Sequence, residues 1–159
     1  FAPDWVEMVD SNRLIPPQPD HMATIDAAGK EHPFRLMTSP SRSYLNTSFT
    51  ELPSGRKREG RPTVMLHADD AARLGIADGD KAVLGNARGE VVLHARIATG
   101  LQPGVLVSES IWPSEAFEGG IGINALTSDD PGPPLGGAVF HDTAVWLRPA
   151  MAAMALAAE

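Results

Sequence analysis

The sequence contains no cysteine in its 159 residues. This absence excludes disulfides, thiolate zinc sites, cysteine-bound iron–sulfur clusters and a cysteine nucleophile within the chain. No uncharged apolar run reaches the roughly 18–20 residues that span a bilayer, so no membrane insertion is expected. Basic residues are also few, with 13 Lys and Arg against 20 Asp and Glu and a net charge of −7. Nucleic-acid binders normally carry a basic surface, so no nucleic-acid partner is expected.

Turn-forming residues, in contrast, are abundant. The chain has 15 glycines and 14 prolines, whereas average usage is about 7% and 5% of residues. This excess favours short strands joined by many turns over a helical bundle. The length suits one domain with a core of its own.

The composition of the chain changes near both ends, which predicts domain boundaries there. Residues 1–32 are polar and rich in proline, which predicts a flexible linker or N-terminal extension, and residues 150–159 form an Ala-rich tail. The domain itself is expected at residues 33–149. Because the chain begins with Phe1 rather than Met, we expect it to be cut from a longer protein.

Hydrophobic patterning between these ends is mostly that of β-strands. In the clearest case Val91, Leu93 and Ala95 share one face of a strand, which is typical of a half-buried strand. A short helix is predicted from a cap at Asp69 or Asp70 through Leu74. The segment 51–62, with its cluster of arginines and a lysine, is predicted to be a solvated loop. Strands are predicted at 33–38, 63–66, 81–84, 90–97, 105–108 and 143–147, which together favour a closed or nearly closed small β-barrel.

Several motifs then occur in a fixed order. They are 36–39 (Leu-Met-Thr-Ser), 69–80 (Asp-Asp-Ala-Ala-Arg-Leu-Gly-Ile-Ala-Asp-Gly-Asp), 86–89 (Asn-Ala-Arg-Gly), 103–105 (Pro-Gly-Val), 112–113 (Trp-Pro) and 124–127 (Asn-Ala-Leu-Thr). In this order they resemble the C-terminal molybdopterin dinucleotide-binding domain of the dimethyl sulfoxide reductase superfamily, which includes formate dehydrogenases and nitrate reductases. The resemblance covers residues 33–147.

The resemblance implies a double-psi β-barrel, related to the aspartate decarboxylase-like barrel, with a few short helices. It also implies a cofactor: molybdopterin guanine dinucleotide, in its bis-form with molybdenum or tungsten, within a larger oxidoreductase. The isolated domain is expected to be inactive, to hold no catalytic or metal-binding residue and to carry no bound cofactor. Its expected partners are the other domains of that enzyme and an iron–sulfur electron-transfer protein. The expected location is cytoplasmic, with the periplasm as the alternative.

The resemblance also assigns candidate cofactor-binding residues. Four of them lie at or after the end of the first strand, in its polar loop, and match cofactor-contacting positions of the family: Thr38, Ser39, Arg42 and Asn46. The last of the motifs supplies a fifth, Asn124. Trp112 matches an aromatic position on the pterin side. Hydroxyl, amide and guanidinium groups are what a pyrophosphate, a ribose and a base edge require.

Other interpretations stay open at this level. The polar loop could be an ordinary turn, Asn124 a helix cap, and Trp112 a core aromatic. The domain could be a stand-alone recognition or adaptor barrel without a redox role. A decarboxylase of the same barrel class is disfavoured because the Gly-Ser pair expected at its processing site is absent. The five histidines at 21, 32, 67, 94 and 141 show no metal-ligand spacing and are predicted to be structural or surface residues.

Overall fold

The computed structural model describes residues 26–132 and 137–150. The predicted tail at 150–159, apart from its first residue, and most of the predicted linker at 1–32 lie outside these residues. Within the described part no helix is long and apolar enough to cross a membrane.

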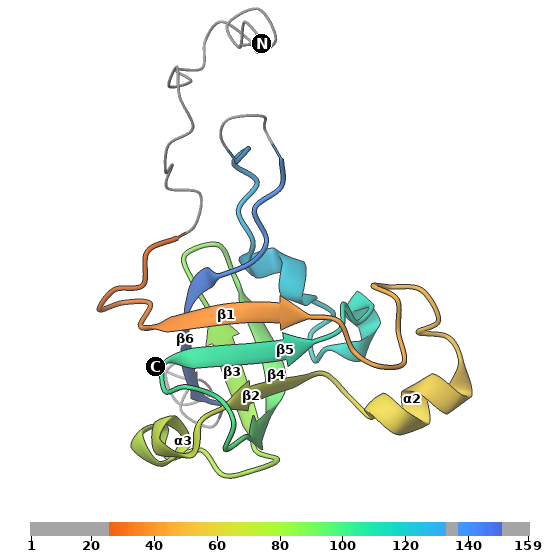
Figure 1. Cartoon of the computed structure of the whole chain (residues 1–159), viewed down its shortest axis with the longest axis horizontal. Helices are drawn as coiled ribbons and strands as arrows, with labels where there is room; N and C mark the ends of the chain where they lie inside the picture. The colour runs from red at the N-terminus through yellow and green to blue at the C-terminus, as the bar shows by residue number, and fades with distance from the viewer. Residues whose placement is uncertain (1–25, 133–136, 151–159) are drawn as a thin grey trace, which may run out of the picture.

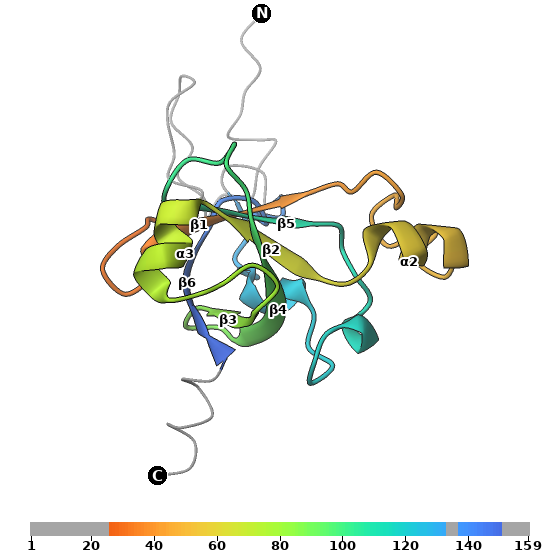
Figure 2. The same ribbon diagram turned by 90° about the horizontal axis from the view of Figure 1, so that it is seen from below.

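Six strands close into one barrel (Figures 1 and 2). Around the barrel they follow the order β1-β5-β2-β4-β3-β6, so neighbours in space are seldom neighbours in sequence. The strands are β1 (Phe34–Ser39), β2 (Thr63–Leu66), β3 (Lys81–Gly85), β4 (Glu90–Ile97), β5 (Val105–Glu109) and β6 (Thr143–Pro149). The predicted β-rich barrel is confirmed, and each strand lies within two residues of its predicted ends.

Two of the strand pairings are parallel. β1 pairs with β5 and β2 pairs with β4 in the same direction, whereas the other pairings are antiparallel. Parallel strands need a long connection between them. The polar segments and helices of the chain lie in these connections. As a result the loops that leave β1 and β5 start from the same edge of the barrel.

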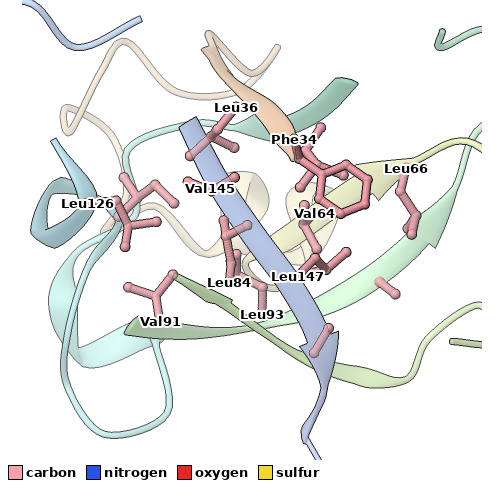
Figure 3. Close-up of a cluster of buried hydrophobic side chains, with 14 of the residues drawn as sticks. Phe34, Leu36, Val64, Leu66, Leu84, Val91, Leu93, Leu126, Val145 and Leu147 are labelled. Atoms are coloured by element: carbon pink, nitrogen blue, oxygen red, sulfur yellow. The ribbon is translucent and has the colours of Figure 1, made fainter. Parts of the chain in front are cut away.

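Aliphatic side chains fill the barrel interior (Figure 3). Along β4 the burial alternates as predicted, with Val91, Leu93 and Ala95 buried and the residues between them more exposed. Leu84, Val145 and Leu147 come from β3 and β6 to meet them, while Leu126 enters from the short 3₁₀ helix η2 (Ile123–Leu126) on one side (Figure 3). These contacts bury most of the apolar surface that stabilises the fold.

The helix α3 (Ala68–Leu74) begins two or three residues earlier than predicted. His67 is the cap, and its Nδ1 accepts a hydrogen bond from the Asp69 backbone N–H at 3.1 Å. Asp70 is instead buried and accepts from the Gly104 backbone N–H at 2.7 Å and from Arg73 at 2.6 Å. The prediction of an aspartate cap was therefore wrong, because Asp70 ties α3 to the turn before β5. The predicted end was right: Gly75 is left-handed, at φ 66°.

The prediction of a loop at 51–62 was also wrong. Residues Pro53–Glu59 form a helix, α2, that lies beyond one end of the barrel, with α3 near the other (Figures 1 and 2). Pro53 sets the backbone angle of the first helical position, and the basic residues after it are good helix formers. Gly55 is buried against the Tyr44 ring, where a Cβ would come within 2.9 Å of Tyr44 Cε1. Gly55 thus lets the helix pack closely on Tyr44.

Gly85 supplies a test of the barrel packing. A Cβ at this position would overlap the indole of Trp146, which pairs with Gly85 across β3 and β6. The indole is held in place by the Arg148 guanidinium, 4.2 Å from the ring centre, and Arg148 is paired with Glu90. Gly85→Ala should therefore lower the free energy of unfolding by about 1–3 kcal/mol in urea titrations. Gly100→Ala, with no atom within 4 Å of its new Cβ, should change it by less than about 0.5 kcal/mol. Equal effects would contradict this account of the packing.

Candidate functional site

The carboxyl ends of β1 and β5 meet at one edge of the barrel (Figure 1). Thr38 is in register with Ser108 and Ser39 with Glu109. Just beyond the strands, the Ser110 backbone N–H donates to the Ser39 carbonyl at 2.7 Å. Two polar segments far apart in sequence therefore leave the sheet together.

A pocket of about 300 Å³ opens between these segments. We call it the hydroxyl pocket because four of its lining residues carry hydroxyls. Its lining is Thr38, Ser39, Pro40, Ser41, Asn46, Ser110, Ile111, Phe140 and His141. Phe140 and His141 contact Thr38 directly, with Thr38 Oγ1 3.4 Å from the Phe140 carbonyl oxygen and 3.5 Å from His141 Nδ1. Among the described residues, no Asp or Glu lines this pocket.

Two of the pocket hydroxyls are buried and have no hydrogen-bond partner. These are Ser41 Oγ and Ser110 Oγ. Leaving a buried polar group unpaired costs about 1–3 kcal/mol, and native proteins seldom accept that cost without a reason. Both oxygens have almost no accessible surface, so they do not face the pocket itself. The other polar residues of the lining, Thr38, Ser39 and Asn46, are of the kind that binds a polar ligand.

Three residues at or beside this pocket have a left-handed backbone. Asn46 and Ser110, which line it, have φ values of 52° and 71°, and Asp142, next to His141, has 61°. Asn and Asp adopt this region more readily than other residues besides glycine, so the backbone strain falls mainly on Ser110. Asp142 is held in place by an ion pair with Arg35 of β1. This ion pair fixes the backbone beside the pocket.

A second pocket of about 290 Å³ shares Ile111 with the first. We call it the glycine pocket; it is lined by Ile111, Trp112, Ser114 and residues 120–125. Trp112 is buried and meets Tyr44 edge to face, with ring centres 5.1 Å apart. Burial raises the pKa of the Tyr44 hydroxyl, which keeps it neutral. Asn124 is exposed on the short 3₁₀ helix η2 (Ile123–Leu126).

The motif Asn86-Ala87-Arg88-Gly89 holds η2 in place. The buried Leu126 carbonyl accepts hydrogen bonds from Asn86 Nδ2 at 2.8 Å and from Arg88 Nη1 at 3.2 Å. Gly89 lies so close to η2 that a Cβ there would be 3.3 Å from the Ala125 carbonyl oxygen. The turn between β3 and β4 therefore positions the helix that carries Asn124.

The candidate residues fall into two groups. Thr38, Ser39 and Asn46 line the hydroxyl pocket, and Trp112 and Asn124 line the glycine pocket. Arg42 is exposed and lies outside both. Each assignment to the cofactor stays a prediction.

The sequence analysis did not assign Ser41, Ser110, Phe140 or His141 to the site, although all four line the hydroxyl pocket. Ser41 lay within the polar loop that was singled out, so a wider choice of hydroxyls there would have included it. Nothing in the sequence near Ser110 indicates its place, which depends on the parallel pairing of β1 with β5. Within the described residues no group of three or more His, Asp or Glu side chains could hold a metal ion.

Comparison with known families identifies this architecture. Residues 34–144 match the family model described as "Molydopterin dinucleotide binding domain". The chain belongs to this family. The match spans both pockets, the first five strands and the start of β6.

Curated relatives of this domain include oxidoreductases. A probable oxidoreductase of Bacillus subtilis, YoaE, is 36% identical over 118 residues, which is 74% of this chain and 17% of that protein. The dimethyl sulfoxide/trimethylamine N-oxide reductase of Rhodobacter capsulatus is 30% identical over 66% of the chain and 14% of its own length. Dimethyl sulfoxide reductase DmsA of Escherichia coli is 28% identical over 76% of the chain and 15% of its own length. The chain thus spans about a sixth of the length of these relatives.

A solved structure shows the same fold. The acetylene hydratase of Pelobacter acetylenicus superposes with a TM-score of 0.64 at 18% identity, over 75% of this chain and 18% of that one. The closed six-stranded barrel with parallel pairs β1–β5 and β2–β4 is consistent with the double-psi barrel that the sequence motifs implied.

Arg88, which contacts η2, also forms an ion pair with Asp26. This pair predicts that the stability of the fold depends on pH. Arg88 contacts both carboxylate oxygens of Asp26, at 2.8 and 3.0 Å, and these hydrogen bonds lower the pKa of Asp26. A lowered pKa means that the pair stabilises the fold above the ordinary aspartate pKa of about 3.9. That stability is lost as the pH falls through the lower pKa of the folded state.

Asp26→Asn should therefore lower the free energy of unfolding at pH 7 by up to about 1 kcal/mol, since the pair is partly exposed. At pH 2 the difference in stability between the variant and the wild-type chain should be smaller than at pH 7 in urea titrations, because protonation of Asp26 weakens the pair. A difference that is the same at both pH values would show that Asp26 acts through packing rather than charge.

Proposed function

We propose that this barrel holds the guanine dinucleotide end of a molybdopterin cofactor within a larger oxidoreductase. The observation that carries the proposal is the polar lining of the hydroxyl pocket, at the carboxyl ends of β1 and β5, on a chain of the matching family. A recognition or adaptor barrel would not need this polar pocket or the segment that carries Asn124. The bis-form of the cofactor, with molybdenum or tungsten, is part of the proposal.

Each pocket supplies a different kind of contact. Thr38 and Ser39 offer hydroxyl donors to oxygen atoms of the nucleotide. Asn46 and Asn124 offer amides, which can both donate to and accept from a base edge or a ribose. Trp112 presents an aromatic wall to the glycine pocket.

The cofactor, when bound, supplies the electron-transfer and atom-transfer chemistry at its metal. The residues of this chain bind and orient its nucleotide end and exclude water from it. The isolated domain is accordingly proposed to be inactive by itself. We propose that it forms the C-terminal domain of its enzyme, that an iron–sulfur protein exchanges electrons with that enzyme, and that the enzyme is cytoplasmic.

The surface of the domain supports a partner domain at the α2 end of the barrel. In the loop before α2, Leu45, Phe49 and Leu52 are 66%, 48% and 45% exposed. We call this the apolar loop. Phe49 also has a left-handed backbone, at φ 70°, which is costly for a large side chain. Contiguous exposed apolar side chains of this kind commonly mark an interaction surface. We propose that another domain of the enzyme covers it.

The apolar loop should bind a hydrophobic dye in the isolated domain. Leu45→Glu should reduce the fluorescence of bound anilinonaphthalene sulfonate at least twofold, because it places a charge within the exposed apolar surface. The matched control is Ala72→Glu, an equal charge change at an exposed position of α3 near the other end of the barrel. If both variants reduce the fluorescence equally, the dye responds to net charge and the apolar loop is not the binding surface.

Nucleotide binding tests the proposed function directly. A site shared between domains leaves this chain with only some of its contacts. Hydrogen bonds to charged groups contribute about 1.5–3 kcal/mol each, while association costs at least about 4 kcal/mol. GDP should therefore bind with a dissociation constant on the order of millimolar. In NMR titrations the amide signals of residues 38–46 and 124–127 should shift together.

Asn124→Ala should weaken those shifts by removing an amide from the glycine pocket. His94→Ala serves as the control, because His94 lies on the wall of β4 and lines neither pocket. Shifts confined to residues 56–61 would indicate attraction to the basic α2 segment alone, and the proposed function would then be wrong.

A further inference from the structure

The basic side chains of the chain fall into two groups. Six of them form ion pairs with carboxylates: Arg35, Arg73, Lys81, Arg88, Arg96 and Arg148. Within residues 26–132 and 137–150, no carboxylate forms an ion pair with Arg56, Lys57, Arg58 or Arg61 at the α2 end. Glu59 of α2 accepts instead from the Ser43 backbone N–H at 2.9 Å. The α2 end thus gathers free positive charge on a chain whose net charge is −7.

A groove of about 250 Å³ lies beside this charge, between α2 and residues 112–116. We call it the α2 groove. Its lining includes Arg56, Arg61, Pro62, Trp112, Pro113 and Glu115. Arg56 is fixed there, because its Nε donates to the Thr50 carbonyl at 2.6 Å. The two prolines and the indole give the groove apolar walls, and Glu115 is the one carboxylate among its described lining residues. The α2 groove therefore suits an occupant that is both acidic and apolar.

The first ten residues of the chain have this chemistry. Asp4, Glu7 and Asp10 are acidic, and no lysine or arginine occurs before Arg13. Trp5 and the apolar residues at 6, 8 and 9 lie between these acids. We call residues 1–10 the acidic segment. They lie outside the described residues, and their charge and aromatic side chain are complementary to those of the α2 groove.

The described chain begins on the side of the barrel that leads to this groove. Its first residue, Asp26, is bound by Arg88, which also donates to the Leu126 carbonyl of η2. Residues of η2 line the glycine pocket, and Trp112 lines both that pocket and the α2 groove. The chain from Asp10 to Asp26 can span up to about 50 Å, whereas a domain of this size has a radius of gyration of about 14 Å. The acidic segment can therefore reach the α2 groove.

We propose that the acidic segment docks in the α2 groove, where its carboxylates pair with Arg56 and Arg61 and Trp5 packs on the apolar walls. The proposal goes beyond the proposed function and does not depend on it. The apolar loop is separate, because Leu45, Phe49 and Leu52 do not line the groove. A partner domain can therefore cover that loop while the segment is docked.

A weak contact is enough for a segment of the same chain. Each exposed ion pair contributes little by itself, and an arginine over an indole adds a further modest attraction. Attachment to the barrel, however, gives the segment an effective concentration on the order of millimolar. An intrinsic dissociation constant of about 0.1 mM would then keep the groove occupied in about nine of ten chains.

A nitroxide spin label tests where the acidic segment lies. The chain has no cysteine, so Ala2→Cys creates a single labelling position in the full 159-residue chain. A docked segment should bring the label close enough to broaden the amide signals of residues 56–61 and 112–116 in NMR spectra. The signals of α3, near the other end of the barrel, should stay sharp (Figure 1). High salt should remove the broadening, because it screens charges at the surface.

Charge reversal on either side should release the label. Arg61→Glu should lower the ratio of docked to free segment about twofold to fivefold, as expected from the loss of an exposed ion pair. Glu7→Lys should act to a similar degree while changing only the acidic segment, and combining it with Arg61→Glu should restore the broadening. Lys30→Glu is the matched control. It makes the same charge change at an exposed residue outside the groove and should leave the broadening unchanged.

Three results would overturn the proposal. The first is broadening that is absent, or equal at the α2 groove and at α3. The second is an equal loss in Arg61→Glu and Lys30→Glu, which would indicate a response to net charge alone. The third is broadening of an unlabelled, isotope-enriched chain by a separate labelled chain, which would mean that the groove takes the segment of a second copy. None of these measurements involves GDP, so the proposed function is tested separately.

Discussion

The parallel pairing of β1 with β5 is the constraint on which the site depends. Its register places Ser39 opposite Glu109, and the hydrogen bond from Ser110 to Ser39 extends the contact beyond the strands. A slip of one residue would turn every side chain to the opposite face of the sheet. The buried Leu36 and Leu106, which are partners in this register, would then leave the core. The core therefore fixes the register, and the register brings two distant polar segments together.

Features that depend on local sequence were predictable. The alternation in β4 and the left-handed Gly75 follow from patterns a few residues long. The errors arose where a distant contact overrides such patterns. Asp70 leaves its expected cap because the Gly104 N–H offers it a buried partner, and α2 packs its Gly55 on Tyr44 rather than remaining a loop. Neither contact can be read from the residues around it.

The candidate site likewise has one part that could be predicted from local sequence and one part that could not. Thr38, Ser39 and Asn46 belong to one continuous segment, and the structure brings these three to one pocket. The opposite wall comes from residues 110–111 and 140–141, and only the barrel topology joins these to the first segment. Arg42 belongs to the same segment but is exposed and lies outside both pockets, so its assignment to the cofactor stays a prediction.

Hydroxyl and amide side chains, rather than lysine or arginine, make up much of the hydroxyl pocket. A buried arginine would require a permanent carboxylate partner before the ligand arrived, because an isolated buried charge is far more costly than an isolated hydroxyl. Arg35 and Arg96 show that arginines near this pocket are already committed to Asp142 and Glu109. An unpaired hydroxyl costs about 1–3 kcal/mol, which a barrel with this aliphatic core can sustain. The pocket can thus keep its polar lining without a buried charge that would need a partner of its own.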